Sequence, residues 1–189
     1  RITYPEAFTG GERHVFLDGE VFANVVHDEE HPFIIESGNL SLSVLGTTFD
    51  FKSYRDSRCA EVSLVEGVVN LSYDTGIERR DVRLSPGDIV QIDRKTATFD
   101  LSHFATEDYA PFDEGGQIYF SNLPLGDIAQ DLSRIFGEKV YVEDSALANT
   151  RFIAFFNNGE SLEAILSALC SSGGMRFMRH GEFYAITKK

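Results

Sequence analysis

Ala105-Thr-Glu-Asp-Tyr-Ala-Pro-Phe-Asp-Glu-Gly-Gly116 is the stretch at which the character of this 189-residue sequence changes. It combines acidic residues, a proline and a glycine pair without apolar periodicity, which is typical of a linker. Before it the chain consists of short alternating runs, and after it apolar residues recur at helical spacing. The sequence therefore predicts an α+β protein of two domains, residues 1–104 and 117–189, joined by a linker at 105–116.

Short strands are predicted before this stretch. Leu40-Ser-Leu-Ser-Val44 alternates strictly between apolar and polar residues, and Thr48-Phe-Asp-Phe-Lys-Ser-Tyr54 alternates as well. Asp18-Gly19 separates two further runs and is a strong signal for a β-hairpin. Leu84-Ser-Pro-Gly-Asp88 predicts a turn in which proline fixes φ and glycine takes a positive φ. Since no helical period is present, this region predicts an all-β sandwich, roll or barrel.

Two amphipathic helices are predicted after the linker. The apolar residues that mark them are Leu125, Ile128, Ala129, Leu132, Ile135 and Phe136, and then Leu162, Ile165, Leu166 and Leu169. Pro124 stands in the first turn of the first helix and Gly137 just past its end, which is the expected asymmetry. Gly173-Gly174 ends the second helix.

This second region repeats itself. Phe120-Ser-Asn precedes the first helix as Phe156-Asn-Asn precedes the second, and each helix is followed by a strand pattern, Val140–Val142 or Met175–Met178. A hairpin around His180-Gly181 closes the region. One βαβ unit cannot bury its helix alone, so the repeat predicts a small α+β domain with two helices on a sheet.

The charge and composition of the chain argue against several classes of partner and site. The formal net charge of −13 argues against nucleic acids and anionic membrane surfaces as partners, because phosphates would repel the chain. Cys59 and Cys170 form no CxxC motif, which argues against a thiolate metal site or disulfide framework. No apolar run approaches the ~20 residues of a membrane span. Arg1 begins a strand-like run without an initiator Met, so we expect a piece of a longer protein.

Both halves resemble one family, the FecR-like regulators of sigma factors. In the first half the resembling stretches are Leu17-Asp-Gly-Glu-Val-Phe22, Pro32-Phe-Ile-Ile35, Val44-Leu-Gly-Thr-Thr-Phe49, Val62-Ser-Leu-Val-Glu-Gly-Val-Val69 and Leu84-Ser-Pro-Gly-Asp88. In the second half they are Ile118-Tyr-Phe-Ser-Asn-Leu-Pro-Leu125, Phe155-Phe-Asn-Asn158 and Leu162-Glu-Ala-Ile165. This half resembles the C-terminal domain of Bacteroides-type FecR-like proteins, which is similar to the short N-terminal domain of secretins and TonB-dependent transducers.

The resemblance implies the periplasmic region of a single-pass inner-membrane anti-sigma factor. The signalling domain of an outer-membrane TonB-dependent transducer would contact this region, and an N-terminal segment absent here would bind an extracytoplasmic-function sigma factor. Signalling proteins of this kind need no cofactor, metal or small-molecule ligand and are not enzymes. Many members carry a Trp near the domain junction. This chain has no Trp, and Tyr109 or Phe112 is expected in its place.

Gly46-Thr47 is a candidate self-cleavage bond, because some FecR-like regulators cleave themselves at a Gly-Thr bond in this motif. The Thr47 hydroxyl would attack the Gly46 carbonyl, and water would then open the ester. The sequence identifies no base for this step. The alternative is a strand with a glycine bulge whose threonine packs in the sheet.

The last predicted strand is a candidate partner-binding edge because of its terminal position, where main-chain groups would be unpaired. It consists of Phe183, Tyr184, Ala185, Ile186 and Thr187.

Two further hypotheses concern ligands. His27-Asp-Glu-Glu-His31 has the spacing of a metal motif, but Asp28 stands where the zinc signature has Glu and Pro32 favours a loop, so an acidic turn is the preferred interpretation. A glycan-binding β module is the other alternative, although the chain has no Trp on which a sugar could stack.

Overall fold

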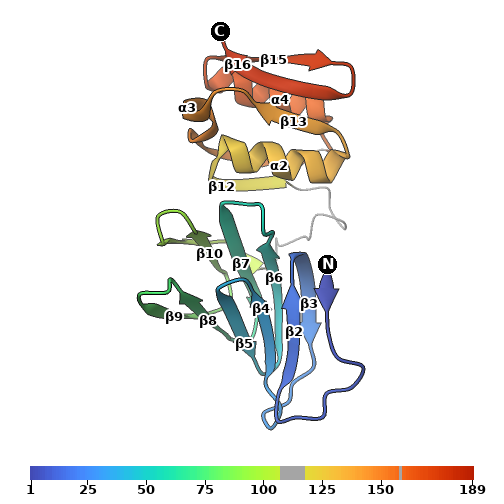
Figure 1. Cartoon of the computed structure of the whole chain (residues 1–189), viewed down its shortest axis with the longest axis vertical. Coiled ribbons are helices and arrows are strands. Elements are labelled where there is room, and N and C mark those ends of the chain that lie inside the picture. The colour runs from blue at the N-terminus through green and yellow to red at the C-terminus, as the bar shows by residue number, and fades with distance from the viewer. Residues whose placement is uncertain (107–117, 158) are drawn as a thin grey trace. The chain divides into compact units, whose positions relative to one another are not determined.

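The computed structural model describes residues 1–106, 118–157 and 159–189, which belong to two compact units (Figure 1). The first unit holds the described residues up to 106 and the second those from 118 onward. The first is built of strands and the second of strands and helices, so the broad α+β prediction is confirmed. The predicted linker at 105–116 lies mostly outside the described residues, and the domain limits stay a prediction.

The strands of the first unit form two sheets. They are β1 (Ile2–Thr3), β2 (Arg13–Leu17), β3 (Gly19–Val25), β4 (Phe33–Ser37), β5 (Leu40–Val44), β6 (Thr47–Ser53), β7 (Cys59–Glu66), β8 (Val69–Asp74), β9 (Arg79–Leu84), β10 (Asp88–Asp93) and β11 (Thr98–His103). One sheet has the order β1-β2-β4-β5-β8-β9 and the other β11-β10-β7-β6-β3. All neighbouring strands are antiparallel except β2 and β4, which are parallel.

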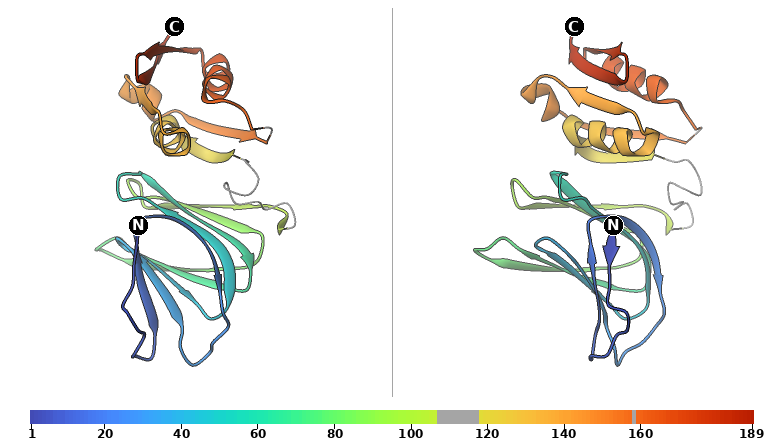
Figure 2. Two further views of the ribbon diagram at one scale, coloured as in Figure 1. Left: turned by 90° about the vertical axis from the view of Figure 1, so that its right-hand side faces the viewer. Right: turned by 45° about the vertical axis from the view of Figure 1, so that its right-hand side comes forward.

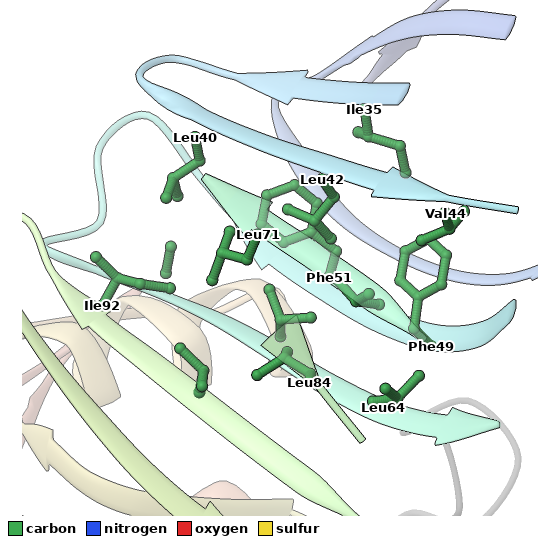
Figure 3. Packing of buried hydrophobic residues seen from close by; sticks show 14 of the residues in the cluster. Ile35, Leu40, Leu42, Val44, Phe49, Phe51, Leu64, Leu71, Leu84 and Ile92 are labelled. Carbon is green, nitrogen blue, oxygen red and sulfur yellow. The ribbon is translucent and has the colours of Figure 1, made fainter. Parts of the chain in front are cut away.

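Both sheets contribute to one core, which makes this unit a β-sandwich. Leu42 and Val44 of β5 lie among Phe49 and Phe51 of β6 and Leu64 of β7 (Figure 3). These side chains are buried, and they come from every second residue of each strand. The alternation seen in the sequence is therefore the alternation between core and surface.

The hairpin predicted at Asp18-Gly19 is wrong. Strands β2 and β3 flank this dipeptide but belong to different sheets, where β2 pairs with β1 and β4 and β3 pairs with β6. A two-residue type I′ turn needs a positive φ at both central residues, and Asp18 has none. The dipeptide instead carries the chain across the sandwich, and the amide of Asp18 donates to the carbonyl of Arg1.

The turn predicted at Leu84–Asp88 is confirmed. The amide of Asp88 donates to the carbonyl oxygen of Ser85 at 3.0 Å, and Gly87 has a φ of 90°. This is the geometry of a type II turn with proline at its second position. It joins β9 to β10 and so also carries the chain from one sheet to the other.

The second unit contains three helices among its described residues. Its elements are β12 (Ile118–Pro124), α2 (Leu125–Phe136), β13 (Lys139–Val142), α3 (Ser145–Ala148), β14 (Arg151–Phe156), α4 (Leu162–Ser172), β15 (Met175–His180) and β16 (Phe183–Lys188). Pro124 is the N-cap of α2, and Gly137 ends it in the left-handed conformation, as predicted. The short helix α3 was not predicted; Asp144 caps it by accepting the amides of Ala146 and Leu147.

The expected single sheet is replaced by two small ones, and this part of the prediction is wrong. Strands β12 and β14, the first strands of the two repeats, pair with each other, while β13, β16 and β15 form a second sheet in that order. Each helix therefore leads the chain from one sheet to the other. Helix α2 packs against β12 and β13, and α4 against β14 and β15 (Figure 2).

Candidate functional site

The Gly46-Thr47 bond lies at the start of β6, just after β5 ends. Thr47 pairs with Val25 of β3 and is 3% exposed. Its Oγ1 donates a hydrogen bond to the carbonyl oxygen of Val68 at 3.0 Å. Thr47 thus packs in the sheet, and whether the bond cleaves itself stays a prediction.

Three segments meet at this bond. A Cβ added to Gly46 would lie 2.6 Å from the Cα of His27 and 2.7 Å from its Nδ1. A Cβ added to Gly67, whose φ is 89°, would lie 2.6 Å from the carbonyl oxygen of Gly46 and 2.9 Å from Oγ1 of Thr47. Both glycines are therefore needed for close packing. The sequence did not predict these contacts, because they join residues that are far apart along the chain.

These contacts bear on whether the Thr47 hydroxyl could attack the Gly46 carbonyl. The Gly46 carbonyl oxygen and the Thr47 hydroxyl both face Gly67, so they lie on the same side of the chain. The hydroxyl donates to a main-chain carbonyl, which is too weak a base to take its proton. The exposed imidazole of His27 lies beside Gly46, with its Nε2 3.5 Å from Oε1 of Glu29.

The loop that contains His27 is an acidic turn. Oδ1 of Asp28 accepts the amides of Glu30 and His31, each at 3.0 Å, and Oδ2 lies 3.0 Å from Nδ1 of His31. Burial alone would raise the pKa of Asp28, but its hydrogen bonds to His31 and Glu30 outweigh this and lower that pKa. In the described part of the chain no three His, Cys, Asp or Glu side chains gather into a metal site.

The predicted edge strand Phe183–Thr187 is not an edge. It lies within β16, which pairs in parallel with β13 on one side and antiparallel with β15 on the other. Tyr184, Ala185 and Ile186 are buried. The main-chain groups of this strand are engaged on both sides, so they are not free for strand addition. The open edges of this sheet belong to β13 and β15.

Tyr184 has a structural role on the helix-covered side of this sheet. Its hydroxyl donates to Oε1 of Glu163 at 2.9 Å, and the guanidinium of Arg179 lies 5.3 Å from its ring centroid. Burial, followed by the hydrogen bond to Glu163, raises the pKa of Tyr184. Arg179 also pairs with Glu138 at 3.1 Å. This network ties β15 and β16 to α4, and removing β16 would destroy the sheet.

Two protein-family models match this chain. A family model described as "FecR protein" matches residues 1–70, and a second, described as "FecR, C-terminal", matches residues 117–186. Together they match more than half of the chain, in the order expected for one protein.

The chain belongs to the FecR family. It is thus a FecR-like anti-sigma factor, a regulator of a sigma factor. The first family model ends inside β8, whereas the sandwich of this FecR-like protein continues to β11. The second model begins one residue before β12 and covers the α+β unit almost to its last strand residue.

Two solved structures have a fold similar to that of this chain. Two crystal structures of a candidate anti-sigma factor from Parabacteroides distasonis ATCC 8503, at 1.65 and 2.50 Å resolution, match with a TM-score of 0.87 and 24% sequence identity. The match covers 100% of the FecR-like chain and 86% or 85% of the two solved chains. A search of curated proteins found no match.

No helix in the described ranges is long and apolar enough to cross a membrane. Tyr109 and Phe112, expected in place of the junction Trp of other FecR-like proteins, lie outside the described residues, as does Asn158 of the Phe155–Asn158 stretch.

Proposed function

We propose that this chain is the periplasmic sensing region of a single-pass inner-membrane anti-sigma factor. An outer-membrane TonB-dependent transducer passes a signal to this region, and an N-terminal segment on the cytoplasmic side controls an extracytoplasmic-function sigma factor. The observation that supports the proposal is the order of the two family models, FecR protein over 1–70 and FecR C-terminal over 117–186.

The second unit is the part that we propose contacts the transducer. Through Ile118–Leu125, Phe155–Asn158 and Leu162–Ile165 it resembles the C-terminal domain of FecR-like proteins, which is similar to the short N-terminal domain of such transducers. Residues 118–189 contain eight acidic and seven basic residues, whereas the whole chain has a net charge of −13. A nearly neutral unit in an acidic protein can approach a charged partner with little long-range repulsion.

A binding experiment tests this function. The purified chain is titrated with the purified signalling domains of the transducers encoded near its gene, and binding is followed by calorimetry. One of these domains should bind, and a signalling domain from an unrelated transducer serves as the control. If none of the encoded domains binds and the chain is folded, the transducer proposal is wrong, while membership of the FecR family is unaffected.

A narrower proposal concerns self-cleavage at Gly46-Thr47. It is favoured by the placement of the Gly46 carbonyl and the Thr47 hydroxyl on the same side of the chain, against Gly67. Oγ1 of Thr47 forms an ester bond to the Gly46 carbonyl carbon, the peptide C–N bond breaks, and the hydroxyl proton ends on the freed amine. Water then hydrolyses the ester and leaves one chain that ends at Gly46 and one that begins at Thr47.

Mass spectrometry tests the cleavage. The full-length protein in inner-membrane vesicles should yield a new chain end at Gly46, and Thr47→Ser should keep this ability because it retains a hydroxyl. Thr47→Val has a similar shape without the hydroxyl and should stay intact. Intact mass of the unaltered protein over several days, or cleavage of the Val variant, would refute the proposal.

A further inference from the structure

One face of the three-stranded sheet is left uncovered. The helix-covered face carries the buried residues Val140, Tyr184 and Ile186. The register of β13, β16 and β15 places six exposed side chains on the opposite side, around Ala185 and Thr187 of β16. We call this side the outer face; its exposed residues are Lys139, Tyr141, Arg176, Met178, His180 and Phe183.

Aromatic and sulfur-containing side chains occupy the middle of the outer face. The ring of Phe183 lies 5.6 Å from that of Tyr141 and 5.4 Å from that of His180, measured between centroids. Tyr141, Met178 and Phe183 are 50%, 41% and 36% exposed, and Tyr141 and Met178 flank the buried Ala185. A contiguous surface rich in Tyr, Phe and Met is typical of the centre of a protein–protein interface.

Cations border these apolar side chains. Among the described residues, no carboxylate pairs with Arg176 or Lys139; Arg176 donates to Oγ1 of Thr187. Residues 175–189 carry four basic residues and one acidic residue, although the whole chain has a net charge of −13. Next to Arg176 and Met178 the surface forms an open depression of about 470 Å³, which Glu143, Asp144, Thr187 and Lys188 also line. Strand β15 itself carries Arg176, Arg179 and His180 and no carboxylate, so along this strand charge complementarity favours an acidic occupant.

Strand β15 adds an open sheet edge to this face. It pairs with β16 on one side and with no described strand on the other, so one row of its main-chain groups is available for strand addition. Antiparallel pairing of β15 with β15 of a second copy would place the Arg176 side chains of both copies on the same face of the joined sheet. Like charges opposite each other are destabilising. A second copy is therefore a poorer occupant than an acidic chain.

We propose that the outer face and the open edge of β15 form the docking surface for an acidic, extended segment of a partner protein. The segment pairs with β15, places carboxylates next to Arg176 and His180, and places an apolar side chain next to Met178. The inference deepens the proposed function and rests on it for the identity of the partner. The chemistry of the docked segment follows from this sheet alone.

A peptide titration tests the chemistry. The probe is the synthetic peptide Ser-Glu-Thr-Val-Thr-Glu-Ser, whose alternate residues match Arg176, Met178 and His180, and the counter-probe replaces both Glu by Lys. In NMR spectra of the whole chain, the acidic peptide should shift the amides of β15 and the ring signals of Tyr141 and Phe183. It should bind about tenfold more tightly than the basic peptide at low salt, and the difference should shrink as salt is added.

Charge reversal provides the matched control. Arg176→Glu should weaken binding of the acidic peptide about tenfold, whereas Arg83→Glu changes the net charge equally on β9 of the first unit and should leave binding unchanged. Both arginines are exposed, so both variants should fold, which their amide spectra verify. Equal binding of the two peptides, no binding of either, or shifts confined to other elements would overturn the inference, as would self-association through this face.

The same variant separates this inference from the proposed function. If a transducer domain binds the chain and Arg176→Glu leaves its affinity unchanged, the docking surface is wrong and the function stands. If no transducer domain binds but the acidic peptide does, the surface stands and the function is wrong.

Discussion

In both units the chain passes from one sheet to another, but different kinds of segment make the connection. In the sandwich, short corners such as Asp18-Gly19 and Glu66-Gly67 lead from strand to strand across the core. In the second unit, helices α2 and α4 make this passage. A corner relies on the backbone conformation of one or two residues, whereas a connecting helix is held in place by many side-chain contacts. In the first unit, substitutions at a few corner positions should therefore cause most of the loss of stability. In the second unit, the loss should be spread over many helix positions.

The largest effect is expected at a corner of the sandwich. Gly67→Ala should destabilise the first unit by about 4 kcal/mol, because it adds strain at a φ of 89° and a Cβ 2.6 Å from the Gly46 carbonyl oxygen. Chemical denaturation followed by NMR signals of each unit measures this. Gly76→Ala is the matched control: its φ is 79° and an added Cβ meets nothing within 4 Å, so it should cost about 1 kcal/mol. Equal losses would show that packing at the corner is unimportant.

A core helix residue should come next. Ile128→Ala in α2 should cost about 3 kcal/mol, because this side chain is fully buried and its loss leaves a cavity. Ile153→Ala makes the same change in the same unit at a side chain that is 73% exposed, and should cost well under 1 kcal/mol. Signals of the second unit report both. Similar losses for the two variants would contradict the burial described for α2.

The buried ion pair of the sandwich should have a smaller effect that depends on pH. Oδ2 of Asp93 lies 2.6 Å from Nη2 of Arg58, and Asp93→Asn should cost about 2 kcal/mol at neutral pH. Burial alone would raise the pKa of Asp93, but hydrogen bonds from Arg58 and the amides of Lys95 and Thr96 outweigh it and lower that pKa below its ordinary value.

The lowered pKa fixes the direction of the pH dependence. Because Asp93 holds its proton more weakly in the folded chain, its contribution is complete above the unfolded pKa and is lost as pH falls through the folded pKa. The free energy of unfolding of Asp93→Asn should therefore approach that of the unaltered chain below about pH 4. A difference that stays constant down to pH 2 would contradict this.

The smallest effect is expected at a helix cap. Ser161 accepts the amide of Ala164 at 3.3 Å, and Ser161→Ala should cost about 1 kcal/mol. Ser167→Ala removes an exposed hydroxyl from the interior of the same helix and should be neutral or slightly stabilising, since alanine is the better helix former. Hydrogen exchange of the α4 amides compares the two, and a larger loss for the interior variant would contradict the cap assignment.

Local signals in the sequence predict single elements but not how the strands are arranged into sheets. Elements were predictable where a local signal defines them, as in the alternation of Leu40–Val44 or the Pro124 and Gly137 limits of α2. The sheet to which a strand belongs was not predictable, because an Asp-Gly dipeptide such as Asp18-Gly19 can form either a hairpin turn within one sheet or a corner between two sheets. The close packing of Gly46 against His27 and Gly67 could not be predicted either, since it depends on contacts between segments that are distant in the sequence.

The position of β16 has a consequence for how the second unit assembles. It comes last in the order of this unit's strands yet lies at the centre of its sheet, between β13 and β15. Neither neighbour has a strand to pair with in that sheet until β16 is available. The sheet can therefore close only after the entire unit has been synthesised and has passed through any export channel, and until then its unpaired strands need protection from aggregation.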